Sequence, residues 1–311
     1  MTTQLDHLDS RAHSEVSDST RGLIALLIAF STWGVLVLYL RLLHHVPAGQ
    51  IMACRLVFCA VFVSLFLWAR GAFSEVVSAL RNPQVRRRLF ASAALISVNW
   101  LVFTWAVTHD HVIEGSLGYF INPLVSVLLG VLVLRERLRR AQWLAVAIAA
   151  CGVAYMTWLA GAVPWLALVL AVSFGAYGLL RKTVQVDAMA GLAAETLLIA
   201  PLGFAYLVYC ELQGVGPLRH AESLTTLGLL AGSGIVTAVP LWLFSYGARR
   251  VPLATVGLMQ YIAPSLQLVF GIAVFNERFD QSRAVGFAFI WLALALYAFD
   301  GLYSRERVPA R

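Results

Sequence analysis

Two ionisable side chains lie inside strongly apolar stretches of the sequence, where a charge is costly. Arg55 occurs in IMACRLVFCAVF and Glu195 in GLAAETLLIAPLGF. A charge at the centre of a membrane-spanning helix costs roughly 2.5–3.5 kcal/mol on insertion scales, so it usually serves a function. We expect Arg55 to attract an anionic group and Glu195 to attract a cation or a proton. The alternative is that each side chain snorkels to the interface or bonds to a neighbouring carbonyl.

A second set of polar and aromatic side chains lies within the apolar stretches. Aromatic walls with a few amides suit a partly apolar solute that also forms hydrogen bonds. Asn122 is the strongest candidate, because Pro123, which kinks helices, follows it. The candidate solute-binding residues are Asn122, Tyr119, Arg55, Glu195, Asn99, Trp100, Gln260, Gln267 and Trp33. For each uncharged residue, an interhelical hydrogen bond or aromatic packing is the alternative role.

The loops contain a histidine cluster whose spacing matches no standard metal site. THDHVIEG contributes His109, Asp110, His111 and Glu114. Such groups bind zinc or titrate near neutral pH, and an intramembrane hydrolase therefore stays open as an alternative. Solvated loop residues are the favoured interpretation, because no nucleophile or complete ligand set accompanies them. We expect no enzyme activity, no cofactor and no metal, and the sequence contains no phosphate-binding motif for ATP.

The elements that position these residues follow from a composition that is 60% hydrophobic and only 13% charged. Apolar runs of roughly 17–22 residues recur, and each is long enough to cross the hydrocarbon core as a helix. The sequence therefore predicts an all-α polytopic membrane protein with ten transmembrane helices. The predicted spans are 22–43, 51–69, 89–107, 116–134, 143–159, 164–180, 191–209, 224–246, 255–275 and 284–303.

The basic residues are distributed unevenly between the two sides of this ten-helix arrangement. The side that holds both termini carries 18 Lys and Arg residues and the other side carries 4, with Arg55 inside a span. Cytoplasmic loops are enriched in Lys and Arg, so both termini are predicted to be cytoplasmic. The same distribution explains the net charge of +7 without a nucleic-acid partner.

The polar residues 1–21 lack periodicity and are predicted to form a disordered cytoplasmic tail. They contain no apolar core that would make a signal peptide. The four cysteines have no metal spacing and are expected to be small apolar residues rather than a disulfide framework.

An internal repeat appears when the sequence is shifted by 141 positions. The shift places Pro123 on Pro264, Gly130 on Gly271, and Glu136-Arg137 on Glu277-Arg278. The prediction is a first five-helix repeat at 22–160, a second at 161–304, and a short cytoplasmic tail at 305–311. Because five is odd, the second copy must be inverted in the membrane, as is common in secondary transporters.

The repeated residues also have modest structural interpretations. The two prolines would kink helices beside a shared cavity, or serve packing alone. The two glycines are expected at close helix contacts. The Glu-Arg pairs are expected to be solvated or to form ion pairs across a loop.

Several motifs resemble the RarD group of the EamA-type drug/metabolite transporter (DMT) superfamily. They are IAFSTWG, HVIEGSLGYFINPLVSVLLG, RERLRRAQWLAVAIAACGV and GLMQYIAPSLQLVFGI, and the resemblance covers nearly the whole chain after residue 21. It implies a bacterial inner-membrane permease with ten helices in a 5+5 inverted repeat and no defined physiological substrate. Small four-helix members of this superfamily use a glutamate in the first helix for proton exchange. The first span here has no acid, so that route is not carried over.

The sequence thus predicts a multi-pass secondary transporter of the bacterial inner membrane that moves a small organic metabolite or drug-like solute by alternating access. Export is the favoured direction, and an importer or facilitator is the alternative. A membrane scaffold or receptor-like protein is the alternative outside transport. The expected partners are the solute and the lipid bilayer, with a coupling proton or ion left open, and the protein would act as a monomer or homodimer.

Overall fold

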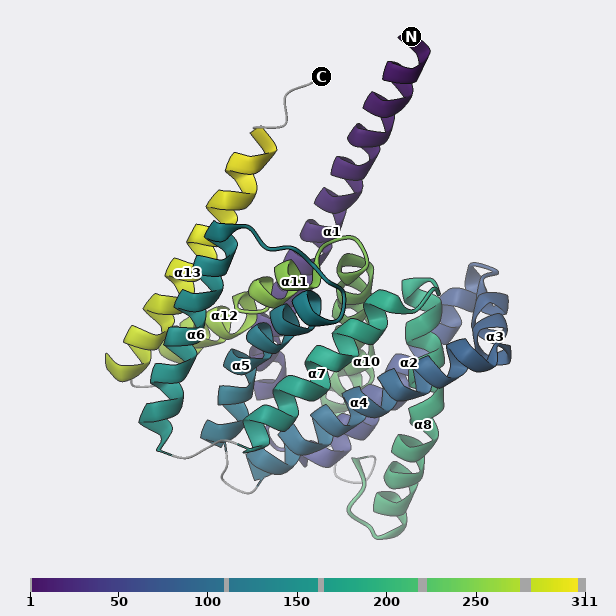
Figure 1. Cartoon of the computed structure of the whole chain (residues 1–311). Coiled ribbons are helices and arrows are strands. Elements are labelled where there is room, and N and C mark those ends of the chain that lie inside the picture. Colours follow the sequence, from purple (N-terminus) through teal and green to yellow (C-terminus); the bar gives the residue numbers. More distant parts are fainter. Residues whose placement is uncertain (1, 109–111, 162–164, 218–222, 275–280, 307–311) are drawn as a thin grey trace. The chain divides into compact units, whose positions relative to one another are not determined.

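The computed structural model consists of helices joined by short connections over the residues that it describes (Figure 1). Its backbone is described for residues 2–108, 112–161, 165–217, 223–274 and 281–306. Its side chains are described for residues 18–103, 118–159, 161, 165–217, 223–270, 272–274 and 284–300.

The chain forms two compact units, each made of two separate stretches of sequence. Unit 1 contains residues 1–94 and 180–252, and unit 2 contains residues 95–179 and 253–311. The helices of unit 1 are α1 (Thr2–Leu42), α2 (Ala48–Ala69), α3 (Phe73–Arg81), α8 (Ala188–Leu212) and α10 (Leu224–Ala248). The helices of unit 2 are α5 (Val112–Leu132), α6 (Arg140–Ala160), α11 (Leu253–Met259), α12 (Ile262–Ala273) and α13 (Gln281–Glu306). Two further helices, α4 (Pro83–Thr108) and α7 (Trp165–Thr183), each begin in one unit and end in the other.

In unit 1, α2 packs against both α8 and α10 through small residues. A Cβ on Gly203 of α8 would lie 3.3 Å from the carbonyl oxygen of Ala53, and one on Gly49 of α2 would lie 2.8 Å from the Tyr206 hydroxyl. The two helices are therefore antiparallel. Gly234 of α10 approaches α2 still more closely, because a Cβ there would lie 2.4 Å from the Phe58 carbonyl carbon. Small residues let helix backbones approach in this way.

In unit 2, two antiparallel helix pairs surround one apolar core. α6 runs beside α13 (Figure 1). Gly152 and Met156 of α6 meet Phe289 and Gly286 of α13 in that order. α5 packs against α11, where a Cβ on Gly257 would lie 2.6 Å from the Pro123 carbonyl oxygen. The buried core between these pairs consists of Phe120, Val127, Ala145, Ala149, Val153, Ala254, Leu258, Tyr261, Phe287, Ile290 and Ala293.

The helices confirm a polytopic membrane protein. Among the described residues, seven helices are long and apolar enough to cross a membrane, and two shorter apolar stretches occur at Gly118–Leu132 and Ala284–Asp300. Nine of the ten predicted spans each coincide with one helix. One of these nine, the span 89–107 in α4, is not among the apolar stretches just described. The predicted span 255–275 is divided into α11 and α12 by a break at Gln260 and Tyr261. The count of ten membrane crossings stays a prediction.

Two elements differ from the prediction. The structure continues α1 back to Thr2, whereas the sequence predicts a disordered tail at 1–21. Extending an existing helix needs no new nucleation, so polar residues can continue the turn that the apolar span begins. The nine-residue helix α3 was not predicted, because it is too short to span a membrane; its Val76 and Ala79 are buried, and Glu75 and Arg81 mark its ends.

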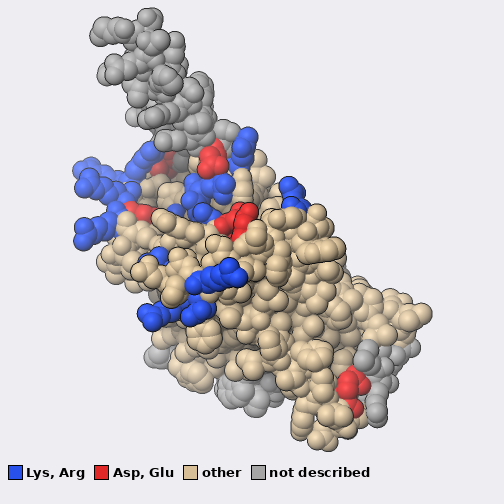
Figure 2. Space-filling model, turned by 90° about the vertical axis from the view of Figure 1, so that its right-hand side faces the viewer, with Lys and Arg blue, Asp and Glu red and all other residues tan. Residues whose placement is uncertain are grey.

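Large apolar side chains are exposed along the helices, as a lipid solvent requires. Trp68, Leu101, Trp158, Leu202 and Leu224 are examples, each more than two thirds exposed. On the face drawn in Figure 2, the charged side chains are grouped and uncharged surface extends over wide areas between the groups. A surface of this kind fits hydrocarbon rather than water.

Candidate functional site

Arg55 lies on α2 in unit 1 and is held in a fixed orientation by α10. Its Nε donates to the Thr237 hydroxyl at 2.9 Å, and Nη1 lies 3.8 Å from the Met52 sulfur. Thr237 is buried and donates in turn to the Ser233 carbonyl at 2.8 Å. Arg55 is half-buried, and its hydrogen bond to Thr237 fixes the orientation of the guanidinium. The predicted span therefore contains a positive charge in a defined position.

Aromatic side chains of α1 contact α10 on either side of Thr237 along that helix. The Tyr39 hydroxyl donates to the Leu229 carbonyl, and the ring of Trp33 lies 5.8 Å from that of Phe244. Trp33 also contacts Phe30 at 5.6 Å between ring centroids. Unit 1 therefore contains an oriented cation between α2 and α10 and an aromatic cluster between α1 and α10.

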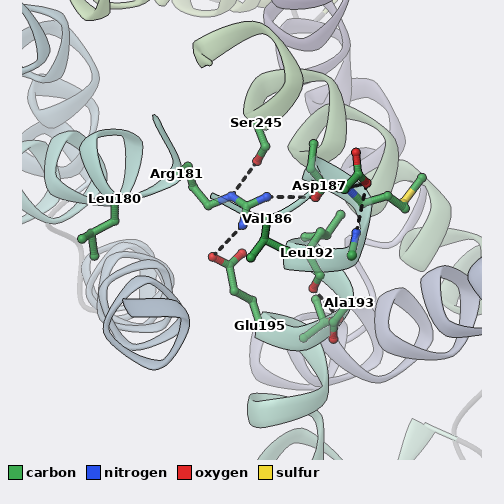
Figure 3. Close-up of polar contacts among 12 residues, drawn as sticks. Leu180, Arg181, Val186, Asp187, Leu192, Ala193, Glu195 and Ser245 are labelled. Carbon is green, nitrogen blue, oxygen red and sulfur yellow. Dashed lines mark hydrogen bonds and ion pairs between the residues drawn. The ribbon is translucent and has the colours of Figure 1, made fainter. Parts of the chain in front are cut away.

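Glu195 forms a buried ion pair with Arg181, which is one of the 18 basic residues counted on the side that holds both termini. Arg181 Nη1 lies 3.3 Å from Glu195 Oε1, and the two side chains are 2% and 3% exposed. Arg181 also donates from Nε to the Ser245 hydroxyl at 2.9 Å and from Nη2 to the Ala188 carbonyl at 2.9 Å (Figure 3). The guanidinium thus joins the end of α7 to α8 and α10.

The local sequence explains how this pair fits between the helices. Gly191 faces the guanidinium, and a Cβ there would lie only 2.4 Å from Arg181 Nη1. Asp187 begins α8 by accepting hydrogen bonds from the backbone N–H groups of Met189 and Ala190. The sequence contained a clue to this pair, because a buried carboxylate needs a partner. Arg181 lies in the last turn of α7, and only a short loop separates that helix from α8, which carries Glu195.

In unit 2, Gln260 contacts α5 one helical turn from Asn122, where α5 faces the break between α11 and α12. Gln260 Nε2 donates to the Ser126 hydroxyl at 3.1 Å, and Ser126 lies one turn after Asn122 on α5. The Tyr261 hydroxyl donates to the Phe120 carbonyl at 2.9 Å, which fixes the break against α5. Asn122, Ser126 and Gln260 are all buried.

The remaining candidates occupy more ordinary positions. Asn99 donates to the Leu170 carbonyl at 2.8 Å and to the Ser173 hydroxyl at 3.0 Å, so its amide serves an interhelical contact with α7. Tyr119 is 39% exposed and packs edge-on against Phe103. Trp100 and Gln267 are half-buried in α4 and α12.

Glu136 has a definite structural partner instead of the solvated position expected of it. Its carboxylate accepts hydrogen bonds from the backbone N–H groups of Leu253 at 2.7 Å and Ala254 at 3.0 Å. These are free donors at the start of α11, so Glu136 caps that helix. Its repeat counterparts Glu277 and Arg278 lie outside the described residues.

The histidine cluster is not tested, because residues 109–111 and the side chain of Glu114 lie outside the described part of the chain. Among the described residues, no group of three or more His, Cys, Asp or Glu side chains could hold a metal ion. The four cysteines are free thiols.

Comparison with known proteins places these features in a family context. The model of the EamA-like transporter family matches twice, at residues 20–158 and 162–299. An uncharacterized transporter of Pseudomonas aeruginosa is 45% identical over 93% of this chain and 97% of its own length. Protein RarD of Escherichia coli is 38% identical over 94% of this chain and 99% of its own length. A crystal structure with 21% identity and a TM-score of 0.68 covers 94% of this chain and 99% of that one, and shows that the fold is shared.

Proposed function

The chain belongs to the EamA-like transporter family and is of the RarD type, and from this we propose that it is a secondary transporter of the bacterial inner membrane. It moves a small organic metabolite or drug-like solute by alternating access. The observation that carries this proposal is the double match to a transporter family along nearly the whole chain. Transport rather than catalysis is the activity that such a family implies.

The proposed architecture is ten transmembrane helices in two inverted repeats of five, with both termini cytoplasmic. The two family matches meet near residue 160, where the sequence repeat divides the chain. The pairs α2 with α8, α5 with α11, and α6 with α13 each join repeat-related segments, and each pair is antiparallel. Repeat-related helices that pack antiparallel support an inverted repeat, because a parallel repeat would give them the same direction.

We assign solute contact within unit 1 to Arg55, and solute contact within unit 2 to Asn122 and Gln260. Tyr119, Asn99, Trp100, Gln267 and Trp33 stay in the proposed set as wall residues. Glu195 is assigned to an ion pair with Arg181 rather than to direct contact with a cation, since its carboxylate already has a buried charge partner. Export is the proposed direction, by resemblance to the drug/metabolite transporter superfamily, and import or facilitated diffusion is the alternative.

The function can be tested with purified protein although the solute is unidentified. Proteoliposomes are loaded with a small-molecule extract of bacterial cells, and the compounds that leave are followed by mass spectrometry. We expect one or a few related compounds to leave faster than from liposomes that contain Arg55→Ala. Equal losses from wild-type, variant and empty liposomes would favour a scaffold or receptor-like protein.

A further inference from the structure

Two buried amide oxygens of unit 2 have no hydrogen-bond partner among the residues that the structure describes. They are Asn122 Oδ1 and Gln260 Oε1, and each of these residues is 6% exposed. Buried polar atoms are nearly always paired, because leaving one unpaired costs free energy. Two such atoms of one chemical kind in the same part of the fold therefore need an explanation.

The two amides belong to one site. The amide nitrogen of Gln260 donates to the Ser126 hydroxyl at 3.1 Å. Asn122 precedes Ser126 by one helical turn, so both side chains lie on the same face of α5. The amide nitrogen of Gln260 is thereby held by Ser126, while no residue in the described part of the chain donates to the amide oxygen.

Gln260 lies in the two-residue break between α11 and α12. In the discontinuous helices of transporters, backbone carbonyl groups at such breaks coordinate cations. Acceptor oxygens without donors disfavour an anion, so the missing occupant is a donor or a cation.

We propose that Asn122, Ser126 and Gln260 form a binding site for a monovalent cationic group. The group is an alkali cation that couples to transport, or the ammonium group of the solute itself. Both provide what the two oxygens lack, a positive centre within reach of neutral acceptors. The inference rests on the proposed transport function, which it extends by naming the charge of a bound species.

Thermal unfolding of the purified full-length protein in lipid nanodiscs tests the site directly. The midpoint Tm is measured at one ionic strength in sodium, potassium, methylammonium and N-methyl-D-glucamine chloride. We expect Tm in one of the first three salts to be roughly 5 °C above that in N-methyl-D-glucamine, whose bulk excludes it from a buried site. A response to sodium or potassium identifies a coupling ion, and a response to methylammonium alone identifies the solute's ammonium group.

Variants assign the response to these residues. Asn122→Leu and Gln260→Met remove the acceptor oxygens and should abolish the salt-dependent shift. Asn122→Asp keeps the shape and adds a negative charge, and should give the shift at a roughly tenfold lower cation concentration. Gln50→Met is the matched control, because it removes a buried amide of unit 1 that already donates to the Val215 carbonyl; its shift should equal that of the wild type.

The inference is overturned if Tm is the same in all four salts, because a water molecule would then satisfy the oxygens without cation dependence. It is also overturned if the shift persists in Asn122→Leu and Gln260→Met. Failure of the proposed function gives another pattern of results. If Tm depends on the cation but no solute moves in the proteoliposome assay, the cation site is supported and the transport function is contradicted.

Discussion

Arg181 and Glu195 form an almost fully buried ion pair that connects the end of α7 to α8, with Nη1 3.3 Å from Oε1. In hydrocarbon, neither charge could stay ionised and unpaired at reasonable cost. The bonds of the same guanidinium to Ser245 and to the Ala188 carbonyl make it the centre of a polar network in unit 1. We conclude that this pair organises the unit.

Removing one member of the pair should therefore be costly. Arg181→Met leaves the Glu195 carboxylate buried without its partner, which we expect to cost about 3–5 kcal/mol of stability. In a thermal unfolding experiment this corresponds to a Tm lowered by roughly 10 °C. The double variant Arg181→Met/Glu195→Met should recover most of the loss, since no uncompensated charge remains. A double variant as unstable as Arg181→Met alone would contradict the role of the pair.

Gly191 provides a test of the space around the guanidinium. Gly191→Ala would place a methyl group 2.4 Å from Arg181 Nη1 in the present arrangement, so the ion pair must shift. We expect a clear drop in Tm together with reduced transport. Gly228→Ala in α10 is the matched control, because a Cβ there has no neighbour within 4 Å. It should leave Tm unchanged or raise it slightly, as alanine favours helix; equal effects of the two changes would argue against the packing described.

The cap on α11 predicts a smaller and local effect. Glu136→Gln removes the charge from the acceptor of the Leu253 and Ala254 N–H groups. The expected loss is about 1 kcal/mol, measured as increased hydrogen exchange at the start of α11. Arg137→Gln, which changes the exposed neighbour, is the control and should leave that exchange unaltered. Protection that is unchanged in Glu136→Gln would show that the cap is dispensable.

The sequence predicted much of this fold from simple physics. Hydrocarbon demands long apolar helices, and nine of the ten predicted spans each coincide with one helix. Gly203, Gly234 and Gly257 lie where two helix backbones approach closely. The hydrophobic periodicity of the sequence alone does not locate these helix contacts. The break at Gln260 and Tyr261 was not predicted, because the apolar run continues through it and Pro264 was expected to give only a kink.

The site was less predictable, since it depends on which helices meet. Arg55 and Glu195 were singled out because burying a charge is costly. The partner of Glu195 was not, because Arg181 was counted only among the 18 basic residues on the side that holds both termini. Thr237 and Ser126 were missed because single hydroxyls give no signal in an apolar sequence. Asn99 was a candidate for solute contact, yet its amide bonds to α7.

The orientation of Arg55 leads to a further prediction. Thr237→Val keeps the volume of the side chain and removes the acceptor for Nε. We expect transport to weaken several-fold at equal expression, because the guanidinium loses its fixed direction while its charge remains. Arg55→Lys should weaken transport further, since lysine lacks the planar fork. Transport that is unaffected by all three changes, Arg55→Ala included, would remove Arg55 from the solute site.

The central claim is transport of a small organic solute, and a metabolite comparison in living cells tests it most directly. Cells that lack the gene, cells that overproduce the protein and cells that overproduce Arg55→Ala are compared by untargeted mass spectrometry, inside and in the medium. The account predicts one compound whose level inside the cells changes in opposite directions in the first two strains. The level of the same compound in the medium should change in the inverse sense. Cells that overproduce Arg55→Ala should show neither change. If no compound behaves in this way under any growth condition, the transport function is contradicted.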